Sequence, residues 1–148
     1  MHGKIRRWAA ILVAWSLLAP GLLEARDPEG VNESLQAGFT LLEQGKLHQA
    51  HGVLQGVLRR DPTQPLALNN LAAILGQQGK YDQALNCLKR ALPRARGIKV
   101  ALNRVCNIDG ICAACCPSQG DLGAEDLEAV IKTNILMVEM ARSRRPSR

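Results

Sequence analysis

The chain has 148 residues, a formal net charge of +6 and two Trp, one Tyr and one Phe as its aromatic residues. This length is typical of a single domain. Both tryptophans, Trp8 and Trp15, lie near the N-terminus, so the rest of the chain lacks the aromatic platform that stacks nucleic-acid bases. The basic charge therefore predicts a solvated face rather than nucleic-acid binding.

Residues 1–25 have the pattern of a signal peptide. Three basic residues precede an uncharged, apolar run over residues 8–23, which is short for a bilayer span and is broken by Pro20. We expect export to the periplasm or secretion, with cleavage after Ala25. The alternative is an uncleaved N-terminal segment that anchors the protein to the inner membrane through residues 8–23. Residues 26–30 are expected to form a linker.

The next part of the chain repeats itself. Apolar residues at helical spacing predict a helix that ends before Gly45, followed by helices over residues 48–59, 66–77 and 81–92. Gly45 recurs as Gly79, Ala50 as Ala84 and Leu54 as Leu88, each 34 positions later. A period of this length built from two helices is typical of stacked helix pairs. Asp61-Pro62 and Pro93 are expected to end the second and fourth helices.

These residues resemble the tetratricopeptide repeat family over residues 31–96, in two copies. The better copy carries Leu68-x2-Leu71-Ala72-x2-Leu75, followed by Gly79, Tyr81, Ala84 and Leu88-x2-Ala91. The resemblance implies an all-α fold, a short solenoid of helix pairs closed by a C-terminal capping helix. It also implies a non-catalytic protein that binds another protein.

In this family the first helix of each pair lines a concave groove. By resemblance the lining residues are Asn32, Leu35, Phe39, Leu42, Glu43, Leu66, Asn69, Ala73 and Gln77. Leu35 and Phe39 stand where relatives that bind a peptide carboxylate have Lys and Asn, so we expect no carboxylate clamp. The groove is instead suited to a helix or extended segment held by side-chain contacts. The alternative is that the preceding linker buries Leu35 and Phe39.

Residues 97–148 are expected to close the stack. Leu102 and Val105 lie one period after Leu68 and Leu71, which predicts a partial third repeat helix over residues 99–106. A second helix is predicted over residues 124–141, with Asp121 as its N-cap. Leu136 and Met140 project off its apolar stripe, as a packing edge or a partner-binding edge.

Four cysteines lie within eleven residues between these two segments: Cys106, Cys112, Cys115 and Cys116. In an oxidising compartment they favour disulfides, for example Cys106 with Cys115 or Cys116 and Cys112 with the other. The alternative is a soft-metal site for copper, zinc or an iron–sulfur cluster. A fifth cysteine, Cys87, lies on an apolar helix face and is expected in the core.

The sequence shows no catalytic set, so we expect no enzymatic activity and no resident cofactor apart from the soft-metal alternative. His48 and His51 are one helical turn apart, but exposed histidines of a helix are a simpler interpretation than a metal site. The leading hypothesis is an exported adaptor or scaffold that binds an envelope protein or assembly intermediate through its groove. The alternative is a metal or thiol carrier that uses the four loop cysteines.

Overall fold

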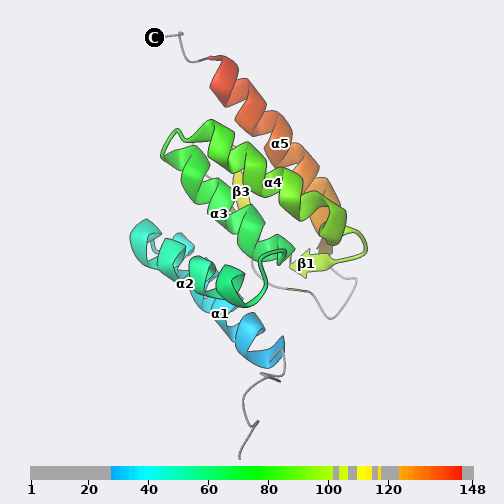
Figure 1. The fold of residues 1–148 in the computed structure, drawn as a ribbon. Helices are drawn as coiled ribbons and strands as arrows, with labels where there is room; N and C mark the ends of the chain where they lie inside the picture. Colours follow the sequence, from blue (N-terminus) through cyan, green and yellow to red (C-terminus); the bar gives the residue numbers. More distant parts are fainter. Residues whose placement is uncertain (1–27, 102–103, 107–109, 115–116, 118–123, 145–148) are drawn as a thin grey trace, which may run out of the picture.

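The computed structural model describes residues 28–101, 104–106, 110–114, 117 and 124–144. The signal or anchor segment, Asp121, Cys115 and Cys116 lie outside the described residues. The described part is mostly helical, which confirms the all-α fold class (Figure 1). Its helices are α1 (Pro28–Glu43), α2 (Leu47–Arg60), α3 (Pro65–Gln77), α4 (Tyr81–Ala95) and α5 (Leu127–Ser143).

The helices α1 to α4 form the two predicted pairs, and each pair turns in the same way. Gly45 and Gly79 have φ angles of 69° and 71°, in the left-handed region that favours glycine. The N–H of Lys46 donates to the Leu41 carbonyl at 2.8 Å, and Lys80 makes the same bond to Leu75 at 2.8 Å. The 34-residue period therefore repeats the helix-ending hydrogen bond as well as the side chains.

Helix α3 is the centre of the molecule. Every residue from Pro65 to Gly76 is buried, because α3 contacts α2 and α4 of the repeats and also α1, α5 and a C-terminal strand. The side chain of Gln64 begins the helix, since its Oε1 accepts hydrogen bonds from the N–H groups of Leu66 at 2.7 Å and Ala67 at 3.3 Å. Both repeats and the C-terminal segment thus pack against one buried helix.

The predicted start of α1 and the predicted end of α4 are wrong. Helix α1 begins at Pro28, so residues 28–30 are helical rather than part of a linker, and proline suits a first helical turn because no intrahelical partner is needed there. Helix α4 continues through Pro93 to Ala95. Pro93 lies exposed in the last turn, where the hydrogen bond that it removes is near the helix end.

The predicted third repeat helix over residues 99–106 is also wrong. These residues contribute two short strands, β1 (Lys99–Ala101) and β2 (Arg104–Cys106). Strand β1 pairs antiparallel with β4 (Ala124–Asp126), and β2 pairs antiparallel with β3 (Cys112–Ala114). A short apolar run does not distinguish strand from helix by its period alone, and β-branched Val100 and Val105 suit the extended backbone.

Helix α5 packs along α4, as expected of a capping helix (Figure 1). It begins at Leu127, three residues later than expected, because Ala124–Asp126 pair with β1. Asp126 is the N-cap and accepts a hydrogen bond from the Glu128 N–H at 3.0 Å. Within the described residues, none of the helices is long and apolar enough to cross a membrane.

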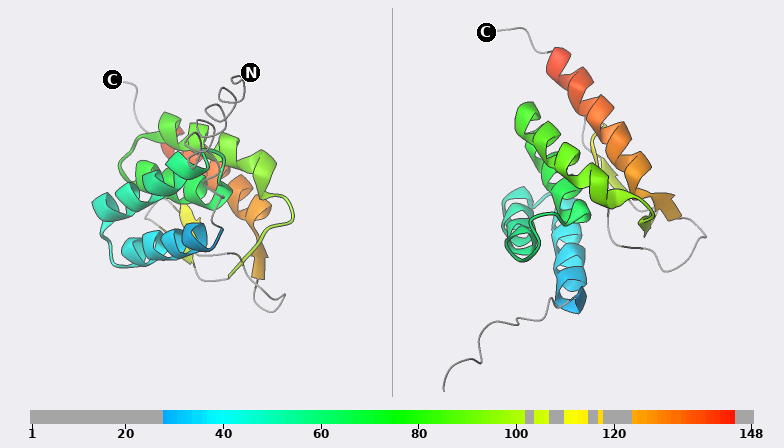
Figure 2. Two further views of the ribbon diagram at one scale, coloured as in Figure 1. Left: turned by 60° about the horizontal axis from the view of Figure 1, so that its bottom comes forward. Right: turned by 45° about the vertical axis from the view of Figure 1, so that its right-hand side comes forward.

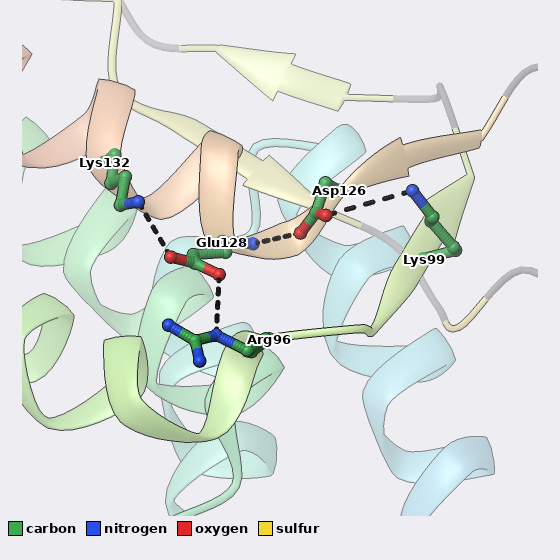
Figure 3. A network of polar contacts seen from close by, with 5 residues as sticks. All are labelled: Arg96, Lys99, Asp126, Glu128 and Lys132. Carbon is green, nitrogen blue, oxygen red and sulfur yellow. Dashed lines mark hydrogen bonds and ion pairs between the residues drawn. The ribbon is translucent and has the colours of Figure 1, made fainter.

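Charged side chains fasten the start of α5 to the end of α4 and to β1 (Figure 3). Glu128 lies between Arg96 at 3.6 Å and Lys132 at 2.7 Å, and Lys99 lies 3.8 Å from Asp126 on the neighbouring strand. The hydrogen bond and the positive charge of Lys132, followed by the charge of Arg96, lower the pKa of the Glu128 carboxyl. These partly exposed contacts direct α5 onto α4 rather than supply most of the stability.

Candidate functional site

Strand β3 occupies the face of the repeats that was expected to be the binding groove. It contacts α1 and α3, the first helices of the two pairs, and also α5. In the right-hand view of Figure 2, the yellow β3 lies between the green helices and the orange α5. The groove is therefore filled by a segment of the same chain.

Asn70 binds the main chain of β3 with both ends of its carboxamide. Its Nδ2 donates to the Ala114 carbonyl at 2.8 Å, and its Oδ1 accepts from the Ala114 N–H at 2.9 Å. Asn70 is 0% exposed, so both hydrogen bonds form away from water. A carboxamide has a donor and an acceptor side by side, which matches the N–H and carbonyl of one extended residue.

Asn134 of α5 binds the main chain of Cys112 in the same way. Its Oδ1 accepts from the Cys112 N–H at 2.8 Å and its Nδ2 donates to the Cys112 carbonyl at 2.7 Å. Asn69 of α3 completes the set: its Nδ2 donates to the same carbonyl at 3.1 Å, and its Oδ1 accepts from Asn134 at 2.8 Å. We call Asn69, Asn70 and Asn134 the asparagine clamp; in the described part of the chain, they are the buried polar residues.

The clamp takes the place of a neighbouring strand. Cys112 and Ala114 are two residues apart, so their main-chain groups point to the same edge of β3. The opposite edge faces β2, where Val105 is the partner of Ala113. One edge of β3 thus pairs with a strand and the other edge with side-chain amides, which satisfies the buried polar groups of the backbone.

The residues predicted to line the groove divide into two groups. Leu35, Phe39, Leu42, Leu66, Asn69 and Ala73 are buried, whereas Asn32, Glu43 and Gln77 are exposed. Leu35 and Phe39 belong to the same buried cluster as Ile111, Ala113 and Ala114. The expectation of an open, apolar groove is therefore wrong, and the covering segment comes from the C-terminal half of the chain.

The disulfide joins Cys106 of β2 to Cys112 of β3, which are cross-strand partners. The example pairing of Cys106 with Cys115 or Cys116 is therefore wrong. Sulfurs in a disulfide offer no thiolate to a metal, so the predicted four-thiolate site is not formed in this structure. Among the described residues, no group of three or more His, Cys, Asp or Glu side chains is arranged to hold a metal ion.

Cys87 is a free, buried cysteine on α4, as its apolar surroundings predicted. Burial raises the pKa of its thiol, and the nearby charge of Arg90 opposes that shift. His48 is exposed on α2 and His51 is half-buried there. Both features fit helix packing rather than a chemical site.

Sequence reasoning missed the role of Asn134. The residue lies on the buried stripe of α5, with Leu127, Val130, Ile131 and Val138, and a buried asparagine at such a position needs hydrogen-bond partners. That signal was present in the sequence. Its partner, the backbone of Cys112, is 22 residues away, and nothing in the local pattern identifies it.

Comparison with known proteins bears on the repeats. Residues 41–102, from the last turn of α1 through β1, match the family model described as Tetratricopeptide repeat. No curated protein and no solved structure matches the chain. Such repeats generally mediate protein–protein interaction. The segment over residues 41–102 is therefore a tetratricopeptide repeat segment, as the sequence indicated, and its groove is occupied by the chain's own strand β3.

Proposed function

We propose that this protein is a non-catalytic adaptor of the cell envelope, exported by its N-terminal segment, which binds another envelope protein or assembly intermediate. The family match supports the binding of a protein. The basic and apolar pattern of residues 1–25 supports export. If that segment is retained, the same adaptor is held at the membrane through residues 8–23.

The observation that carries this proposal is the asparagine clamp. Asn70 and Asn134 each bind one residue of an extended segment through its N–H and its carbonyl. These contacts recognise polypeptide backbone and no particular side chain. The groove of the repeats is thus chemically fitted to hold a strand of protein.

The aromatic residues downstream of the N-terminal segment support a protein partner over a nucleic acid. Phe39 is 1% exposed within the core, and Tyr81 is half-buried on α4. The buried ring of Phe39 offers no face for stacking bases, which leaves Tyr81 as a single, partly buried ring rather than a platform. Three basic side chains between the middle of α4 and the start of β1 are instead engaged with carboxylates or a carbonyl: Arg90, Arg96 and Lys99.

Site-specific photocrosslinking in the native host tests this function. A photoreactive residue at Gln77, exposed at the end of the groove helix α3, is expected to crosslink to one protein of discrete mass. The same residue at Gln83, exposed on α4, is the control and is expected to give little of that product. An intact mass that begins at residue 26 is expected from the same cells.

The proposal fails if neither position crosslinks and the protein is recovered from the cytosol with residues 1–25 in place. A crosslink of equal yield at Gln77 and Gln83 would place the partner surface away from the groove end.

A further inference from the structure

Strand β3 occupies the groove through contacts that another polypeptide can reproduce. The clamp binds only the N–H and carbonyl groups of Cys112 and Ala114. These groups are the same in every amino acid except proline, which lacks the N–H. The hydrogen bonds therefore do not select the sequence of β3 over that of a partner.

The side chains of β3 define what else fits. Cys112, Ala113 and Ala114 are 8%, 1% and 0% exposed, and all three are small. The preceding residue, Ile111, is buried as well. Ile111, Ala113 and Ala114 belong to the same buried hydrophobic cluster as Leu35 and Phe39. A charged side chain at these positions would be buried without a partner, which is strongly unfavourable. The fitting ligand is thus an extended, uncharged segment with small side chains at three successive positions.

The disulfide is what gives β3 an advantage over such a ligand. Strands β2 and β3 have three residues each, and a two-stranded ribbon of this size is marginal by itself. The Cys106–Cys112 bond closes a loop with a sequence separation of 6. Loop-closure entropy for this length corresponds to a factor on the order of 30 in favour of the closed hairpin.

The bond is also open to attack from one side. Cys106 is exposed, whereas Cys112 is buried in the groove. Cys106 is therefore the exposed end of the disulfide, and its Sγ is the expected point of attack by a thiolate reductant. The covalent link that holds β3 thus has one exposed end and one buried end.

We propose that β3 is an intramolecular ligand of the groove, that reduction of the Cys106–Cys112 disulfide releases it, and that an extended, uncharged, small-residue segment of the partner protein then binds in its place. This inference rests on the proposed function, because it assigns the partner to the same groove.

The redox step needs a dithiol reductant. One thiolate of the reductant attacks the Cys106 Sγ, the bond to Cys112 breaks, and Cys112 leaves as a thiolate that takes up a proton. The second thiol of the reductant resolves the mixed disulfide. Two electrons and two protons pass to Cys106 and Cys112, and the reductant becomes a disulfide.

A labelled peptide tests the exchange with the purified protein. The probe is an end-blocked peptide of residues 110–114 with serine in place of the cysteine, Gly-Ile-Ser-Ala-Ala, and its binding is measured by fluorescence anisotropy. The protein reduced with dithiothreitol is expected to bind about 30-fold more tightly than the oxidised protein. A peptide with glutamate in place of the last alanine is the matched control and is expected not to bind.

Two sets of variants separate the clamp from general effects of the reductant. The double variant Cys106→Ser, Cys112→Ser is expected to bind the probe without reductant, as the reduced protein does. In the reduced protein, Asn70→Ala is expected to weaken probe binding at least tenfold, because two hydrogen bonds to the peptide backbone are lost. Asn86→Ala, at an exposed position of α4, is expected to leave binding unchanged.

Three results overturn the inference. The first is equal affinity for the probe with and without the disulfide. The second is loss of the helical circular dichroism signal on reduction, which would make β3 an essential part of the fold. The third is a dimer on reduction without probe binding, which would make β3 of a second copy the occupant. None of these alters the crosslinking result at Gln77, so the two proposals fail independently.

Discussion

The repeats α1–α4 and the C-terminal segment β1–α5 share one apolar core, but they differ in the contacts that fix their backbone. Within the repeats, apolar side chains at helical spacing fill the core, and the turns repeat with the 34-residue period. In the C-terminal segment, the apolar stripe of α5 joins the same core, and directional contacts are added to it: the asparagine clamp, the disulfide and the ion pairs of Glu128. Burial tolerates small shifts of a helix, whereas a bidentate hydrogen bond fixes the register of a strand.

This difference explains how a short repeat array gains a covered face. Two helix pairs leave apolar residues such as Leu35 and Phe39 without a neighbouring repeat. Strand β3 packs against α1 and α3 without adding a third pair, and the clamp satisfies the backbone groups that the strand would otherwise bury unpaired. A covering strand is a smaller element than a repeat, and it is also easier to exchange.

The largest expected effect comes from a cavity in the repeats. Leu68 on α3 is 0% exposed, and Leu68→Ala is expected to lower the free energy of unfolding by about 3 kcal/mol, since α3 is enclosed by its neighbours and cannot collapse onto the gap. Urea denaturation followed by circular dichroism measures this. Leu136→Ala is the control, because Leu136 is 60% exposed and its truncation removes little buried area. Equal effects of the two substitutions would contradict the central place of α3.

A smaller effect is expected from the clamp. Asn70→Ala leaves the N–H and carbonyl of Ala114 without their partner and is expected to destabilise the protein by about 2 kcal/mol. Amide hydrogen exchange separates this from a general loss: the N–H of Ala114 is expected to lose protection while that of Leu54 in α2 keeps it. Equal loss of protection at Ala114 and Leu54 would mean that the clamp stabilises the repeats as much as it stabilises β3.

A substitution in the turn of the first repeat measures the energetic cost of its backbone conformation alone. Gly45 has a φ of 69°, and a Cβ added there would meet no atom within 4 Å, so Gly45→Ala is expected to destabilise by about 1 kcal/mol through backbone conformation only. Gly52→Ala, at an exposed position inside α2 with equally open space, is expected to stabilise by up to about 1 kcal/mol. Thermal unfolding measures both, and the same sign of effect in both variants would contradict this account.

The smallest expected effect is electrostatic and depends on pH. Because Lys132 and Arg96 lower the pKa of Glu128, its contribution to stability is present above the ordinary carboxyl pKa, near 4, and is lost as pH falls through the lower folded value. Glu128→Gln is therefore expected to reduce the melting temperature slightly at pH 7 and to match the unsubstituted protein near pH 3. Glu139→Gln, exposed on the same helix, is the control. A Glu128→Gln difference that persists at pH 3 would point to packing instead of charge.

Local sequence patterns were enough to predict the repeats. The period linking Gly45 to Gly79 and Leu54 to Leu88 predicted both helix pairs, because helix caps and amphipathic spacing are local signals. The sequence also identified the apolar stripe of α5 and the position of Leu136 off that stripe, while the starts of α1 and α5 and the end of α4 were misplaced by a few residues. Helix ends depend on neighbours, as the pairing of β4 with β1 shows.

What fills the groove, by contrast, depends on contacts between distant parts of the chain. Residues 99–106 carry a pattern that suits a helix or a strand, and the choice depends on backbone pairing with β3 and β4. The pairing of Cys106 with Cys112 and the meeting of Asn70 with Ala114 are likewise set by three-dimensional placement; the second joins residues 44 apart in the chain. The repeats follow from local periodicity, but a strand that binds them through its main chain leaves no periodic trace in the sequence, since backbone groups are common to all residues.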